Sequence, residues 1–206
     1  MSRRVLVLAP HPDDETLGCG GAILLHRAQG HAVKVVFVTD GAAGDPRGYY
    51  RGRDYVRLRE REAERAARVL GVRSLEFWRC PDRGLGRVRG LADRLAKLLR
   101  EESPDIVYLP SRSDRHPDHR RLAAACRRLS LPAAWDYETD MMPRPTRVVD
   151  ITRQFKRKLR ALREYRSQLR YRDYAAAIER LNTLRSMFLE GCGYAEAFRA
   201  TGITPG

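Results

Sequence analysis

The chain has 206 residues, of which 43% are hydrophobic and 32% are charged, and its formal net charge is +14. This length and hydrophobic content suit a single folded domain and exclude a chain that is disordered throughout. No run approaches the roughly 20 apolar residues of a membrane span, and the apolar run at residues 5–9 is too short for a signal peptide. We therefore expect a cytoplasmic protein.

Arginine accounts for most of the positive charge, because only four of the 40 basic residues are lysine. A basic surface of this size attracts nucleic acid, anionic lipid or acidic metabolites. The arginines are nevertheless spread along most helical segments, usually beside glutamates, as in residues 57–62. This spread favours a compositional bias on solvated helix faces, and polyanion binding is kept as the alternative. The four scattered cysteines argue against a disulfide framework and against a structural zinc site.

Short apolar runs alternate with helical patterns along the first 110 residues. The runs predict strands at residues 5–9, 33–38, 75–78 and 106–109, with helices at 17–28, 55–70 and 91–101. Gly30 and Gly71 stand where glycines commonly end helices, and Pro104 follows the third helix. Alternating strands and helices indicate right-handed βαβ units, hence an α/β, Rossmann-like, doubly wound and mainly parallel sheet with helices on both faces.

After Pro132 the pattern becomes less regular. Further strands are expected at residues 134–137 and 147–151, and helices at 154–169 and 174–189. We expect one domain over residues 1–206, in which the part from about residue 150 is a helical appendage of the same domain.

Two polar strings, at residues 9–15 and 114–119, hold three of the five histidines together with several carboxylates. They follow the first and the fourth predicted strands. Because ligands bind outside the carboxyl ends of the strands in parallel sheets, both strings should lie at one edge of the sheet. Histidines and carboxylates at one edge are typical of a hydrolytic divalent-metal centre.

In the first string, Pro12 is expected to open a helix at its first position, where its missing N–H costs nothing. Asp13 and Asp14 then fall in the first helical turn, where the helix dipole favours carboxylates. Consecutive helical residues diverge by about 100°, so both cannot point at one ion in the same way. One of them can bind the metal while the other reaches its water, and His11 supplies a nitrogen ligand.

In the second string, Pro117 again suits a first helical position, and His116 and His119 share one helix face. One histidine can bind the metal while the other faces the substrate. Two histidines and one carboxylate with an open position form a common catalytic zinc set, which also suits Fe(II). Either string alone is more often a helix cap or a coincidence, but two at one sheet edge are hard to explain by chance.

A glycine cluster at Gly18, Gly20 and Gly21 raises a dinucleotide-binding alternative. Its spacing is not Gly-x-Gly-x-x-Gly, and it lies too far after the strand to hold a pyrophosphate. We expect these glycines to allow close packing of the helix on the sheet.

Residues 10–21, PHPDDETLGCGG, and residues 116–119, HPDH, closely resemble the signature strings of the LmbE-like, or PIG-L, family of metal-dependent N-deacetylases. The resemblance runs nearly the whole length of the chain. It includes the turn at residues 39–41, the segment from Arg59 to residue 72, the loop at 80–85, and residues 194–198, which are similar to the family's closing helix.

The resemblance implies a role for each site residue. His11, Asp14 and His119 would bind zinc, with Fe(II) or another divalent metal as the alternative. Asp13 would be the general base.

It also implies roles outside the metal set. His116 would stabilise the oxyanion or protonate the leaving amine, and Asp118 would orient it. Arg59 and Asp82 would touch the sugar. The chain departs from the family at Tyr165, where a histidine is usual, and this departure bears on the substrate or the rate.

The function implied is removal of an acetyl group from N-acetylglucosamine joined to inositol, malate, lipid or another sugar. The expected partner is thus a small sugar conjugate with an anionic group as one option, and a homo-oligomer is left open. A metal-dependent amidase acting on a thiol-sugar conjugate or another amide is one alternative. A basic nucleic-acid-binding protein built on an inactive metal fold is the alternative of another class.

Overall fold

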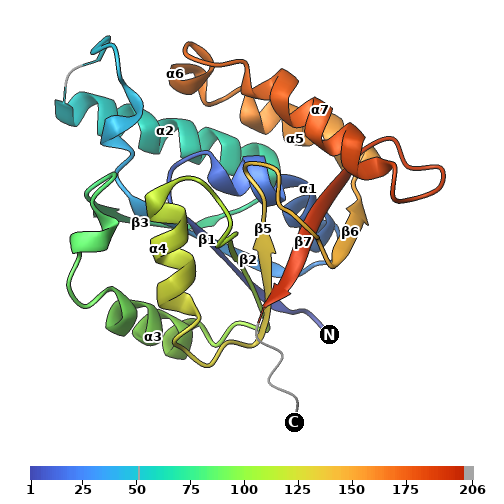
Figure 1. Cartoon of the computed structure of the whole chain (residues 1–206), viewed down its shortest axis with the longest axis horizontal. Coiled ribbons are helices and arrows are strands. Elements are labelled where there is room, and N and C mark those ends of the chain that lie inside the picture. The colour runs from blue at the N-terminus through green and yellow to red at the C-terminus, as the bar shows by residue number, and fades with distance from the viewer. Residues whose placement is uncertain (51, 202–206) are drawn as a thin grey trace.

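A computed structural model describes residues 1–50 and 52–201 of the chain. Strands and helices alternate through the first two thirds of the chain (Figure 1), close to the predicted positions. In chain order, the elements are β1 (Arg4–Ala9), α1 (Asp14–Ala28), β2 (Ala32–Thr39), α2 (Gly52–Leu70), β3 (Ser74–Cys80), α3 (Leu91–Glu102), β4 (Ile106–Pro110), α4 (Pro117–Cys126), β5 (Ala133–Tyr137), β6 (Arg147–Asp150), α5 (Thr152–Leu162), α6 (Arg166–Leu169), α7 (Tyr174–Ser186) and β7 (Ala195–Thr201), with short 3-10 turns η1 (Ala42–Gly44) and η2 (Leu85–Arg87).

The strands form one seven-stranded sheet in the order β3-β2-β1-β4-β5-β7-β6. The first five are parallel, whereas β7 runs antiparallel to both of its neighbours. Helices α1, α2, α5 and α7 cover one face, and α3 and α4 cover the other (Figure 1). The predicted α/β fold with helices on both faces is confirmed. No helix in the described ranges is long and apolar enough to cross a membrane.

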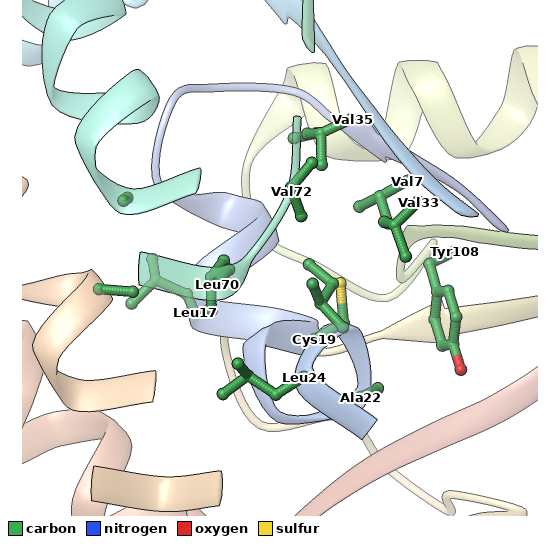
Figure 2. Packing of buried hydrophobic residues seen from close by; sticks show 14 of the residues in the cluster. Val7, Leu17, Cys19, Ala22, Leu24, Val33, Val35, Leu70, Val72 and Tyr108 are labelled. Atoms are coloured by element: carbon green, nitrogen blue, oxygen red, sulfur yellow. The ribbon is translucent and has the colours of Figure 1, made fainter. Parts of the chain in front are cut away.

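Alternate residues of the central strands point to opposite faces and build two hydrophobic clusters. Val5 and Val7 of β1 belong to the cluster under α1 and α2, whereas Leu6 and Leu8 belong to the cluster under α3 and α4. Figure 2 shows residues of α1 gathered against Val7 and neighbouring strand side chains. Burial on both faces explains why these strands read as continuous apolar runs.

Two elements of the last third differ from the prediction. The helix expected at 154–169 is split into α5 and α6, because the chain tightens after Leu162 and turns Tyr165 into the core, where it is fully buried. Residues 194–198 do not form a closing helix. They enter strand β7, because the open edges of β5 and β6 supply backbone partners on both sides, and tertiary pairing overrides the helix propensity of Ala and Glu.

Helix α1 is interrupted at Cys19, whose φ is −144°. Side chains from the last third of the chain pair the backbone groups around this break. The buried ammonium of Lys158 donates to the carbonyl oxygen of Leu17 (2.9 Å) and to the Glu196 carboxylate (2.7 Å). Glu196 accepts from the N–H groups of residues 21 and 22 at 2.7 and 2.8 Å. Elements from the last third of the chain therefore hold α1 in place behind the first polar string.

The glycines of α1 allow close packing, as expected. A Cβ added at Gly18 would lie 2.1 Å from Cδ2 of the buried Tyr137 ring. We expect Gly18→Ala to lower the free energy of unfolding by about 1–3 kcal/mol through overpacking. Urea unfolding would measure it, with Gly86→Ala as the control, since nothing lies within 4 Å of a Cβ there. Equal losses in both variants would contradict this account.

Candidate active site

The structure brings the two polar strings together at the carboxyl ends of β1 and β4. His11 follows β1, and His116 and His119 stand at the start of α4, with Pro117 at a first helical position as predicted. The ring centroid of His11 lies 4.5 Å from that of His116 and 5.3 Å from that of His119. Three of the five histidines thus converge at one edge of the sheet.

One atom from each of the three expected ligands, His11, Asp14 and His119, forms a corner of a nearly equilateral triangle. His11 Nδ1 and His119 Nε2 each lie 3.1 Å from Asp14 Oδ2, and the two nitrogens are 3.2 Å apart. A tetrahedral zinc ion with ligands at 2.0–2.1 Å places them about 3.3 Å from one another. The triangle therefore fits three positions of such an ion and leaves the fourth open.

His116 is the competing ligand. One of its ring nitrogens belongs to a wider group with His11 and His119, and to another with His11, Asp82 and Asp118. In each group the ligand atoms lie within 4.8 Å of one another. The set with Asp14 is tighter and contains a carboxylate. The triangle is therefore the candidate metal site, and His116 lies beside it.

A carboxylate without a role in the sequence-based prediction supports His119. Asp114 Oδ2 lies 2.9 Å from His119 Nδ1, the ring nitrogen that faces away from the triangle. Asp114 is itself held by the hydroxyl of Thr139 (2.7 Å) and by the N–H of His116 (2.8 Å). Metal-bound histidines usually donate their second nitrogen to such a carboxylate. In the sequence, the only sign of this role of Asp114 is its position as the first residue of the second string.

The second nitrogen of His11 faces two carboxylates. His11 Nε2 lies 3.1 Å from Asp82 Oδ1 and 3.5 Å from Asp118 Oδ2. Asp118 also accepts from backbone N–H groups at residues 83 and 85, and its own N–H donates to His116 Nδ1 at 3.3 Å. Asp118 thus contacts His116 through its backbone N–H, while its carboxylate lies close to the His11 ring. Contact between Asp82 and a sugar stays a prediction.

The electrostatics of the triangle favour a bound cation. Burial opposes the charged forms of Asp14 and His119, but their mutual attraction outweighs it. The pKa of Asp14 is held well below its usual range, and that of His119 is raised to about 9, with Asp114 contributing. A metal ion in the triangle would take the place of these protons.

Asp13 adopts a backbone conformation that the sequence did not predict. Helix α1 begins at Asp14 and not at Pro12, because Asp13 has a φ of 137° in the left-handed region. Such a residue costs on the order of 1–3 kcal/mol. Two buried side chains hold it: Glu15 accepts the Asp13 N–H at 3.2 Å, and the Arg59 guanidinium donates to the Pro12 carbonyl oxygen and, at 3.1 Å, to Asp13 Oδ2.

Arg59 and Tyr165 therefore act on the first string. The Arg59 side chain is only 2% exposed and is directed at Asp13, although it also reaches the wall of the cavity that opens over the triangle. Its contact with a sugar stays a prediction. Tyr165, at the position of the family histidine, donates its hydroxyl proton to Glu15 Oε1 at 2.6 Å. It thereby orients the carboxylate that accepts the Asp13 N–H.

The cavity over the triangle has a volume of about 790 Å³. One wall carries the histidines and aspartates of the two strings, and the opposite wall is the apolar face of α7. That face presents Ala177, Ile178, Leu181 and Leu184. Four exposed arginines, Arg83, Arg115, Arg172 and Arg180, lie around the cavity, and Arg115 pairs with Asp140 at 2.9 Å. A site with one polar wall, one apolar wall and a cationic margin suits a polar group carried on a larger ligand.

The model of the family described as PIG-L: GlcNAc-PI de-N-acetylase matches residues 6–130, more than half of the chain. The chain belongs to the PIG-L family. The matched residues contain both polar strings and the whole metal triangle, so the predicted membership is confirmed.

Relatives of this PIG-L member include named deacetylases. A diacetylchitobiose deacetylase from Thermococcus kodakarensis is 30% identical over 190 residues, covering 81% of this chain and 70% of that protein. The N,N'-diacetylchitobiose deacetylase structure from Pyrococcus horikoshii, in complex with an inhibitor, has a TM-score of 0.87 at 28% identity. It covers 99% of this chain and 87% of that one. The prediction of an amide hydrolase is confirmed.

One relative is named for a different reaction. A protein from Pseudomonas putida named 4-oxalmesaconate hydratase is 31% identical over 117 residues, covering 54% of this chain and 45% of that protein. Its match is shorter than that of the Thermococcus deacetylase.

Proposed function

We propose that this chain uses zinc to hydrolyse the N-acetyl group of an N-acetylglucosamine-type sugar conjugate. The observation that carries the proposal is the triangle of His11, Asp14 and His119 with the Asp13 carboxylate beside it on the same cavity. The two diacetylchitobiose deacetylases support it, since their similarity extends over most of the chain.

Zinc suits the triangle better than magnesium or calcium, because two of the three donors are imidazole nitrogens. Fe(II) is the alternative, since two histidines and a carboxylate also form the facial set of Fe(II) sites. A zinc ion held there would polarise the amide carbonyl and lower the pKa of a water molecule toward about 7.

Asp13 is the base in this proposal and accepts the proton that the attacking water loses. Burial raises its pKa to about 7, against the opposing effect of Arg59. A base with a pKa near the working pH is effective, because it is available as the anion and still takes up a proton readily. Arg59 and Glu15 fix the direction of the carboxylate.

His116 acts at the other end of the reaction. Its Nδ1 accepts the Asp118 N–H, so a neutral ring carries its proton on Nε2. Burial, followed by the nearby His11 and His119, lowers the pKa of His116 and favours this neutral form. An Nε2–H of this kind can donate to the developing oxyanion, which favours that role over protonation of the leaving amine.

The margin of the cavity suggests which conjugates fit. Arg172 and Arg180 stand beside the apolar face of α7, and neither has a carboxylate ion-pair partner among the described residues. We infer that the group attached to the sugar is anionic and partly apolar.

The deciding experiment is acetate release by the zinc-loaded protein from a panel of N-acetylglucosamine conjugates with neutral and anionic aglycones. We expect acetate in stoichiometry with free amine, and a lower KM for anionic conjugates. The Arg172→Gln/Arg180→Gln variant should lose that preference while keeping kcat. Release of a larger acid would indicate the amidase alternative, and hydration of 4-oxalmesaconate without acetate release would contradict the proposal.

A further inference from the structure

A second cavity lies away from the active site, where the carboxyl ends of α1 and α2 meet α5. Its volume is about 430 Å³. Leu24 and Val72 contribute apolar side chains from the buried cluster drawn in Figure 2. Its remaining wall is dominated by guanidinium groups, from Arg27, Arg68, Arg73 and Arg157. Nothing in the deacetylation reaction uses these residues.

The four positive charges are not balanced by protein groups. No carboxylate forms an ion pair with any of the four arginines within residues 1–50 and 52–201. Basic residues at helix ends are favourable by themselves, since a helix carboxyl end carries about half a negative charge. Two helix ends supply about one unit of negative charge against the four arginines, of which Arg68, Arg73 and Arg157 are exposed and Arg27 is half-buried.

Two of the arginines are fixed in place and keep donors free. Arg157 Nε donates to the Val69 carbonyl oxygen at 2.6 Å, and Arg27 donates through Nη1 to the His31 carbonyl oxygen. Within the described residues, Arg27 Nε is buried and has no hydrogen-bond partner. A buried donor without a protein partner is uncommon and costly.

We propose that this cavity binds a phosphate-type oxyanion, as the free ion or as the phosphate group of a small organic ester. Guanidinium groups pair with such oxyanions through two parallel hydrogen bonds. The apolar side chains of Leu24 and Val72 would contact the organic part of an ester. A polynucleotide backbone offers the same oxyanion from another source, but a cavity of this size suits a small ligand better than a continuous strand.

The test uses the full chain and inorganic phosphate as the probe. A ligand that binds only the folded state raises Tm, so phosphate should raise it by at least about 3 °C over sodium chloride at equal ionic strength. The Arg27→Gln/Arg157→Gln variant should bind phosphate at least about 10-fold more weakly by titration calorimetry. The matched control is Arg61→Gln/Arg89→Gln, which removes the same charge from exposed positions outside both cavities.

Equal shifts in the wild type, the cavity variant and the control would overturn the proposal, because they would reflect general screening of the net charge. If the first variant does not fold, Arg68→Gln/Arg73→Gln tests the same cavity at two exposed positions. Duplex DNA distinguishes the sources. DNA binding could be lost in the cavity variant, and its log K could fall with log salt concentration at a slope that corresponds to several phosphate contacts. That result would assign the arginines to a polynucleotide and overturn the small-ligand proposal.

Discussion

Replacement of Asp13 by Asn is expected to reduce kcat by about 10²–10⁴-fold while zinc remains bound. The amide still accepts a hydrogen bond from Arg59 but cannot take up a proton from the attacking water. The Asp13 side chain supplies none of the three atoms of the triangle, which come from His11, Asp14 and His119. Loss of the base should therefore separate turnover from metal binding.

The measurement pairs kcat with zinc content on the same sample, and thermal unfolding confirms that the variant is folded. Asp14→Asn serves as the matched control, since it alters the neighbouring carboxylate and should lose the metal as well as activity. Loss of zinc from the Asp13 variant would make Asp13 a ligand. Retention of full activity would remove it from the mechanism.

The largest expected loss of stability follows from Lys158→Met. The Lys158 ammonium is fully buried and lies 2.7 Å from the equally buried Glu196 carboxylate. Removing one partner of a buried pair leaves an uncompensated charge and typically costs about 3–5 kcal/mol. The free energy of unfolding from urea titration should fall by that amount.

Lys97→Met is the matched control, because Lys97 pairs with Glu101 on the surface at 3.7 Å with both side chains more than half exposed. Exposed pairs contribute about 0–1 kcal/mol. The double variant Lys158→Met/Glu196→Gln should recover part of the loss, since it removes both charges. A loss at Lys158 no larger than that at Lys97 would show that the pair does not stabilise the fold.

The parallel half of the sheet could be predicted because its strands are buried on both faces and its helices carry clear end signals. The meeting of the two strings followed from the same topology, since β1 and β4 are parallel neighbours. The conformation of Asp13 could not be predicted. It depends on Arg59 and Glu15 side chains that only the folded chain brings to it.

The last third was harder to predict for a related reason. Residues 195–198 contain good helix formers, and only the open edges of β5 and β6 make them a strand. The break between α5 and α6 similarly depends on burial of Tyr165 against Glu15. Asp114 belongs to the second string, but its contact with His119 could not be predicted, because it depends on where the second ring nitrogen of His119 lies in the folded chain.

The position of β7 between β5 and β6 has a consequence for the order in which the protein folds during synthesis. The five parallel strands can assemble as they leave the ribosome, but the β5 edge stays unpaired until residues 195–201 emerge. An unpaired edge invites pairing with other chains. The contact between Gly21 and Glu196 spans 175 positions, so the backbone of α1 gains this partner only after residue 196 has been translated.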